Sequence, residues 1–68
     1  MKKWTYEQAV KLDVFTDGEQ YVVISSKGDA MVVAACQDFD NIWSFVYFPG
    51  QEYTPSKDDT MIPVSSLI

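Results

Sequence analysis

The sequence predicts an α+β fold in which a short N-terminal helix packs on a curved antiparallel β-meander of three long strands, with short edge segments beside them. Three apolar runs carry this prediction, at residues 21–26, 30–36 and 42–48. Short polar turns separate the runs, as is typical of strands joined by hairpins. The chain has 68 residues and is 47% hydrophobic, so we expect a single folded domain over residues 1–68.

The first element is a short helix over residues 4–12. Thr5 with Gln8 three residues later is the pattern of a capping box, in which each side chain accepts a hydrogen bond from the backbone N–H of the other residue. Tyr6, Ala9 and Val10 then share one face of the helix at i, i+3 and i+4 spacing. A helix of this length is not stable alone in water, so we expect it to pack on the sheet.

A connector and two hairpins follow the helix. Residues 17–18, Asp-Gly, are a strong turn signal, and residues 14–15, Val-Phe, are either a short strand or an anchor into the core. Gly28 supplies the positive φ angle that a tight hairpin needs between the first two strands. A longer polar loop with one aromatic residue, at residues 37–41, joins the second strand to the third.

The C-terminal third has weaker signals. Residues 49–50, Pro-Gly, end the third strand, and residues 51–59 are expected to form an exposed loop. Residues 60–68 look extended, but Pro63 cannot donate to a ladder, which restricts this segment to a sheet edge or to packing without full pairing. In length, strand rhythm and a late short strand at residues 61–64, the chain resembles small SH3-like barrels. The resemblance implies a small barrel as the alternative fold and nothing about function.

Both faces of the predicted sheet are apolar. Residues 21–24 and 31–36 do not alternate between apolar and polar side chains, so each face needs a cover. The helix is long enough to shield only one face. The other face is then closed in one of three ways: the sheet curves into a small barrel, the apolar C-terminal residues fold back over it, or a second copy or a partner covers it.

The composition argues against several classes of function. The chain carries ten carboxylates, five basic residues and a net charge of −5, which disfavours direct binding to nucleic acid. It contains no histidine, hence no ordinary general base near neutral pH and no Ser-His or Cys-His pair, and we expect no enzymatic activity. With Cys36 as the single cysteine there is no soft-metal site, and we expect no metal or other cofactor.

The cysteine content and the length of the apolar stretches indicate the cellular compartment. One cysteine provides no disulfide framework, and no apolar stretch has the length of a signal peptide or a membrane span. The sequence therefore predicts a cytoplasmic protein without membrane contact.

Most of the acidic residues fall in predicted turns. In an up-down-up meander, the segment before the first strand and the loop after the second lie at the same end of the sheet. This end is expected to hold five carboxylates and one aromatic side chain: Asp13, Asp17, Glu19, Asp38, Asp40 and Phe39. One interpretation is that aspartate suits turns and keeps the protein soluble. The other is a docking site for a basic protein surface, with Phe39 as an aromatic anchor inside a charged rim.

A second candidate surface consists of aromatic and terminal residues. Trp43, Tyr47 and Tyr53 are expected to line a groove beside the loop at residues 51–59, and Leu67 and Ile68 end the chain on apolar side chains. These residues predict a small-ligand site or a self-association surface, the latter giving a homodimer.

The leading hypothesis is a small acidic, non-catalytic protein that binds and modulates or inhibits another macromolecule. Its partner would be a protein with a basic surface, such as machinery that handles nucleic acid. Inhibitors of this kind encoded by viruses or mobile elements are often small, acidic and free of catalytic residues, which is an analogy of composition. The alternatives are a small-ligand binding module and a self-associating structural subunit.

Overall fold

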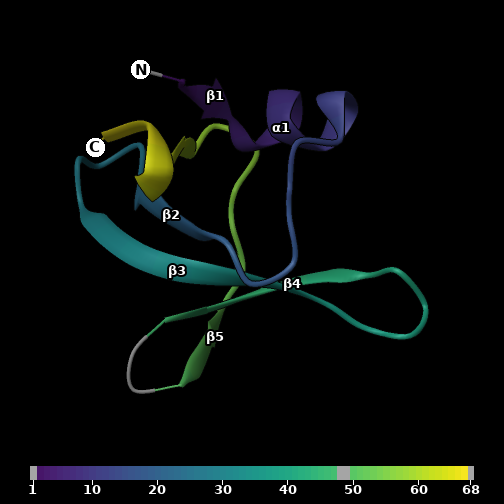
Figure 1. Cartoon of the computed structure of the whole chain (residues 1–68). Helices are drawn as coiled ribbons and strands as arrows, with labels where there is room; N and C mark the ends of the chain where they lie inside the picture. Colours follow the sequence, from purple (N-terminus) through teal and green to yellow (C-terminus); the bar gives the residue numbers. More distant parts are fainter. Residues whose placement is uncertain (1, 48–49, 68) are drawn as a thin grey trace.

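A computed structural model of the chain describes residues 2–47 and 50–67. The described residues form β1 (Trp4–Thr5), α1 (Tyr6–Leu12), β2 (Gln20–Ile24), β3 (Ala30–Gln37), β4 (Trp43–Tyr47), β5 (Gln51–Tyr53), β6 (Thr60–Pro63) and the 3-10 helix η1 (Val64–Leu67). The strands make one sheet in the order β1-β6-β2-β3-β4-β5, and all neighbours are antiparallel (Figure 1). The predicted α+β fold with a short helix on an antiparallel sheet is confirmed.

The order of the strands departs from a simple meander at both ends of the chain. β2, β3, β4 and β5 follow one another, but β6 lies between β1 and β2. Of the two alternatives expected for the C-terminal segment, the sheet edge is wrong, and packing without full pairing agrees with the pairing of Pro63 on the β2 side alone. β1 pairs only with Thr60 and Met61, so Pro63 lies past the end of β1 and its missing N–H breaks no bond to that strand. Residues 51–53, expected in a loop, form β5.

Helix α1 has the predicted cap at Thr5 and ends at Leu12 as predicted, but it begins at Tyr6, and residues 4–5 of the predicted helix form β1. The Thr5 hydroxyl accepts a hydrogen bond from the Gln8 backbone N–H at 3.1 Å, and the Thr5 N–H donates to the Gln8 side chain at 3.1 Å. The capping box is thus complete. Asp13 ends the helix in the left-handed conformation, with φ 53°, and its N–H donates to the Val10 carbonyl at 3.2 Å.

Removal of the cap gives a first test. We expect Thr5→Ala to lower the free energy of unfolding by about 1 kcal/mol, because the Gln8 N–H loses its acceptor and the box is broken. Thr5→Ser keeps the hydroxyl and is the matched control. Urea denaturation followed by circular dichroism measures both variants, and an unchanged midpoint for Thr5→Ala would show that the box does not stabilise the fold.

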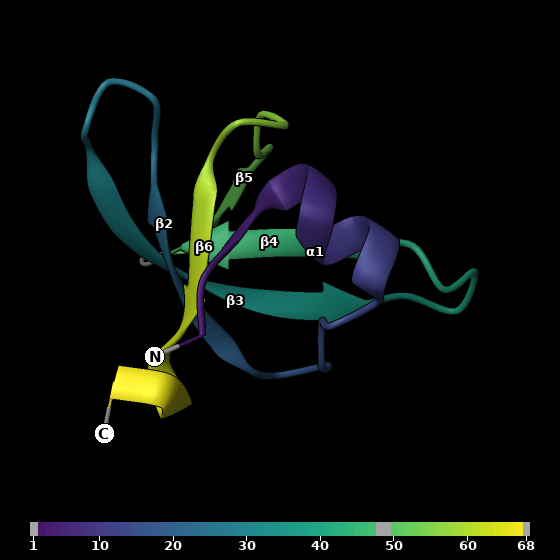
Figure 2. The same cartoon turned by 90° about the horizontal axis from the view of Figure 1, so that it is seen from above.

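One face of the sheet, which we call the inner face, carries the core under α1 (Figure 2). Eight buried residues make up this core: Ala9, Phe15, Tyr21, Val23, Val33, Ala35, Phe45 and Met61. The Phe15 ring lies at its centre, with ring centroids 5.0 Å from Phe45 and 5.6 Å from Tyr21. Residues 14–15 therefore serve as an anchor into the core and not as a short strand.

The opposite, outer face is only partly covered. Ile62 is buried there. The helix η1 lies instead on the side of the core, because its Ser65 lines a depression with Trp4 and Val14 and donates to Glu19, which also accepts from the core residue Tyr21. Of the described C-terminal residues, Ile62 is thus the one that is buried on the outer face. Further along the sheet Val32 is 50% exposed, and Cys36 is exposed as well. The expectation that both faces need a full cover is too strong, because β-branched and small residues on this face remain in contact with solvent.

Candidate functional site

The tip of the β3–β4 hairpin is an ordered turn that presents an aromatic side chain to solvent. The Asp38 carboxylate accepts hydrogen bonds from the backbone N–H groups of Asp40 at 2.8 Å and Ile42 at 2.9 Å. The Asn41 N–H donates to the Asp38 carbonyl at 3.1 Å, with Asn41 at φ 62°. Phe39 sits inside this turn and is fully exposed, at 105% of its reference area. The hairpin extends beyond α1 in the view from above (Figure 2).

The connector before β2 is fastened to the base of the same hairpin. The Asp17 carboxylate accepts a hydrogen bond from the Gln37 backbone N–H at 3.0 Å. The Gly18 N–H donates to the Ala35 carbonyl at 2.7 Å, and its φ of 84° suits glycine in this turn. Asp17 and Asp38 therefore stabilise turns in addition to carrying charge.

A groove of about 500 Å³ separates α1 from the hairpin, and we call it the helix–hairpin groove. Its lining combines three aromatic, two aliphatic and three polar residues: Tyr6, Phe15, Trp43, Val10, Ile42, Asp13, Gln37 and Asn41. The Phe15 ring centroid lies 6.1 Å from that of Tyr6 and 5.8 Å from that of Trp43, so the three rings form one aromatic wall. Val10 and Ile42 are 52% and 59% exposed. The groove thus offers apolar and aromatic surface beside one carboxylate.

Four of the five carboxylates predicted for the acidic end do gather there. Asp13 lines the groove, Asp17 binds the base of the hairpin, and Asp38 and Asp40 lie in its tip. All four are exposed. The fold therefore places one carboxylate, Asp13, in the groove, one at the base of the hairpin and two beside Phe39 in the tip.

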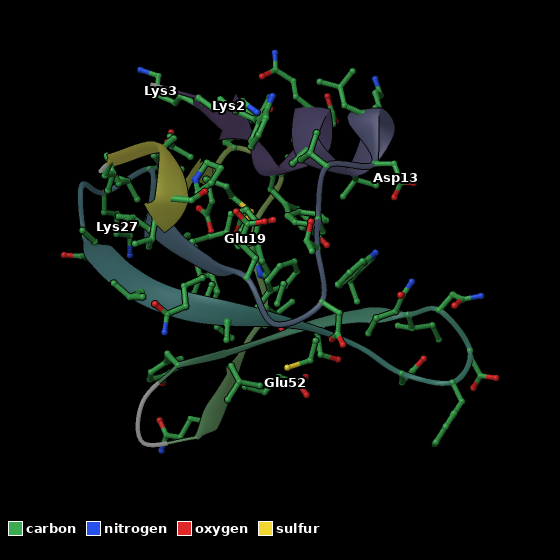
Figure 3. All side chains as sticks on the ribbon, viewed as in Figure 1. Lys2, Lys3, Asp13, Glu19, Lys27 and Glu52 are labelled. Carbon is green, nitrogen blue, oxygen red and sulfur yellow. The ribbon has the colours of Figure 1, made fainter. Side chains whose placement is uncertain are left out.

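The fifth carboxylate, Glu19, lies nearer to η1 than Asp13 does (Figure 3). Its carboxylate accepts hydrogen bonds from the Ser65 hydroxyl at 3.0 Å and from the Tyr21 hydroxyl at 3.3 Å. Burial is the main cause that raises the pKa of Tyr21, and the Glu19 charge adds to it. Glu19 also lines a smaller depression with Lys2 and Trp4, so its side chain belongs to a different surface.

The aromatic groove expected beside residues 51–59 is not formed by all three predicted residues. Trp43 lies in the helix–hairpin groove, whereas Tyr47 and Tyr53 pack against each other at the other end of β4, with ring centroids 6.5 Å apart. The Tyr53 hydroxyl donates to the buried Asp59 carboxylate. Of the terminal pair, Leu67 is exposed on η1 and Ile68 lies outside the described residues.

Sequence reasoning missed several residues that line the groove. The helix pattern predicts Tyr6, Ala9 and Val10 on the face that packs on the sheet, but Val10 is 52% exposed at the groove. Ile42 carries no chemical signal in the sequence. The i, i+4 spacing of Tyr6 and Val10 does place them on one side of α1. The groove becomes visible only once the structure places the β3–β4 hairpin beside this side of α1.

Other kinds of site find no support in the described parts of the chain. Residues 2–47 and 50–67 hold no group of three or more histidine, cysteine or acidic side chains placed to bind a metal ion. Within the same ranges, no helix has the length and apolar character needed to cross a membrane.

Comparison with protein-family models, with curated proteins and with solved structures gave no match for this chain. The resemblance to SH3-like barrels therefore stays a prediction from strand rhythm.

Proposed function

We propose that this protein is a non-catalytic interaction protein that binds a basic surface of another protein through the β3–β4 hairpin tip and the helix–hairpin groove. The observation that carries the proposal is Phe39, fully exposed on a turn that the Asp38 hydrogen bonds hold in one shape. A turn that is ordered before binding loses little conformational entropy in the complex. Large aromatic side chains are also enriched among the residues that dominate binding energy.

The charges around the tip support a basic partner. Asp13, Asp17, Asp38 and Asp40 are exposed at this end of a chain whose net charge is −5. A rim of one sign accelerates the encounter with a surface of the opposite sign and disfavours acidic partners. Phe39 and the apolar residues of the groove then supply the contact that excludes water.

The mode of action that follows is stoichiometric. The protein would act in the cytoplasm by occupying a basic surface of its partner and thereby inhibiting or modulating it. Machinery that handles nucleic acid presents such surfaces, because they bind phosphates. A virus or a mobile element as the source of such an inhibitor remains a prediction from composition.

The Phe39 side chain gives the test. We expect Phe39→Ala to weaken binding of the partner by at least about 30-fold, the effect of removing a residue worth about 2 kcal/mol at an interface centre. The partner is captured from lysate with the tagged protein, identified by mass spectrometry, purified, and titrated by calorimetry at low and high salt.

Val32→Ala is the matched control, because Val32 is exposed on the outer face, away from the hairpin tip. We expect it to bind as the unmodified chain does. Equal affinities for the Phe39 variant and the unmodified chain would refute the proposal, as would the recovery of no protein other than copies of the chain itself.

A further inference from the structure

We propose that the helix–hairpin groove binds an arginine side chain of the partner. This inference rests on the proposed function and adds the chemistry by which the groove takes part in it. The groove is lined by aromatic rings, a carboxylate and two side-chain amides. A purely hydrophobic ligand would make no use of the carboxylate and the amides.

The aromatic wall is the first argument. Tyr6 and Trp43 flank the Phe15 ring at centroid distances of 6.1 and 5.8 Å, with interplanar angles of 37° and 53°. Phe15 is buried, whereas Tyr6 and Trp43 are half-buried, so these two rings are the part of the wall that a ligand in the groove can contact. A cation that lies over an aromatic face is attracted by its quadrupole, and a planar guanidinium also stacks on the ring.

The polar residues of the lining are the second argument. Asp13, Gln37 and Asn41 supply a carboxylate and two amide oxygens, all of which accept hydrogen bonds. The carboxylates of Asp17 and Asp38 accept from backbone N–H groups of the chain itself. Among the described residues the Asp13 carboxylate has no such hydrogen bond, and it is exposed at the end of α1 (Figure 3). It is thus the acceptor best placed for an external donor.

Arginine fits this set of groups better than lysine does. Its guanidinium carries five N–H donors in a fixed plane, so one face can stack on a ring while the edge donates to a carboxylate and to amide oxygens. A lysine ammonium is a compact, strongly hydrated charge that gains less from a flat aromatic wall. Lys11, the basic residue in the last turn of α1, is not part of the lining, so the chain does not fill the groove with a cation of its own.

The experiment uses the purified full chain and four capped pentapeptides that differ only in the central residue, flanked by glycine and serine. The central residues are arginine, its neutral isostere citrulline, lysine and trimethyllysine. Peptides are titrated into isotope-labelled protein, and NMR follows the Trp43 indole and the Gln37 and Asn41 side-chain amides. We expect these signals to move with the arginine peptide, and citrulline to bind at least about 10-fold more weakly because it has no charge to place over the rings.

Two variants locate the binding in the groove. We expect Asp13→Asn to weaken the arginine peptide about 2- to 5-fold, as for an exposed ion pair, and Trp43→Leu to weaken it about 10-fold. Asp29→Asn is the matched control, since Asp29 is an exposed carboxylate in the turn between β2 and β3, at the other end of β3. If Trp43→Leu fails to fold, the Asp13 variant and the citrulline peptide still decide the question.

Three results would overturn the inference: no shift of groove signals with any peptide, equal binding of arginine and citrulline, or tighter binding of trimethyllysine than of arginine. The last result would identify the groove as a site for a methylated ammonium. None of these results concerns Phe39. If binding of the partner depends on Phe39 but the groove does not bind arginine, the proposed function is retained and only this inference is refuted.

Discussion

Phe15→Ala is expected to lower the free energy of unfolding by about 3–5 kcal/mol, because it removes the central ring of the core. The Phe15 side chain is 8% exposed, and its ring contacts those of Tyr6, Tyr21, Trp43 and Phe45. Truncation removes the apolar contacts of the ring and leaves a cavity under α1. A domain of this length has only about 3–10 kcal/mol of stability, so much of the variant should be unfolded.

The matched control for Phe15 is the same substitution at an exposed position. Phe39→Ala removes an identical ring from the fully exposed hairpin tip, and we expect it to change stability by less than about 0.5 kcal/mol. Urea denaturation followed by circular dichroism and tryptophan fluorescence compares the two variants. Similar losses of stability in both would mean that residues 14–15 do not anchor the core.

Asp59→Ala is the second large effect, with an expected loss of about 2–4 kcal/mol, because two part-buried donors lose their charged acceptor. Asp59 is 3% exposed, and its carboxylate accepts from the Tyr53 hydroxyl and from the Ser56 N–H at 3.0 Å. Its backbone carbonyl accepts from the Tyr6 N–H at 2.7 Å. The residue therefore connects the start of α1, the turn before β6 and strand β5.

The hydrogen bond between Tyr53 and Asp59 also changes the pKa of the Tyr53 phenol. Burial, the hydrogen bond to Asp59 and the charge of Asp59 raise the pKa of Tyr53 to about 12, from 10.0. The folded chain therefore binds more protons than the unfolded chain between pH 10 and 12, and the stability contributed by this contact is lost as the pH rises through that interval.

Absorbance of the phenolate follows this titration directly. We expect Tyr53→Phe to remove a phenol that ionises near pH 12, and Asp59→Ala to bring the pKa of Tyr53 down toward its ordinary value. The contact would be shown to be unimportant if Asp59→Ala kept the stability of the unmodified chain and Tyr53→Phe removed a phenol with an ordinary pKa.

Local features of the fold were predictable because neighbouring residues determine them. The capping box of Thr5 and Gln8 and the turn at Gly28 depend on groups a few residues apart, and both occur as expected. The insertion of β6 between β1 and β2 was not predictable, because it pairs the two ends of the chain. The role of Asp59 depends in the same way on Tyr6, which is distant in sequence.

In the candidate site, too, some features were predictable from the order of the elements, and others depended on contacts between distant residues. The hairpin topology was enough to bring Asp13, Asp17, Asp38 and Asp40 to one end. The backbone of Glu19 also lies at this end, just before β2, but an extended backbone alternates its side chains, which puts the Glu19 side chain on the side of Tyr21 and within reach of Ser65. The groove itself needed the packing of α1 against the hairpin, and no sequence pattern encodes that packing.

Site-specific photo-crosslinking tests the central claim, partner binding at the hairpin tip, most directly. Benzoylphenylalanine replaces Phe39 in one variant and Val32 in another, and each is irradiated in cell lysate at low and high salt. We expect position 39 to crosslink to one basic protein, less efficiently at high salt where charges are screened, and position 32 to give no such product. Identical products from both positions, or crosslinks only between copies of the chain, would contradict the claim.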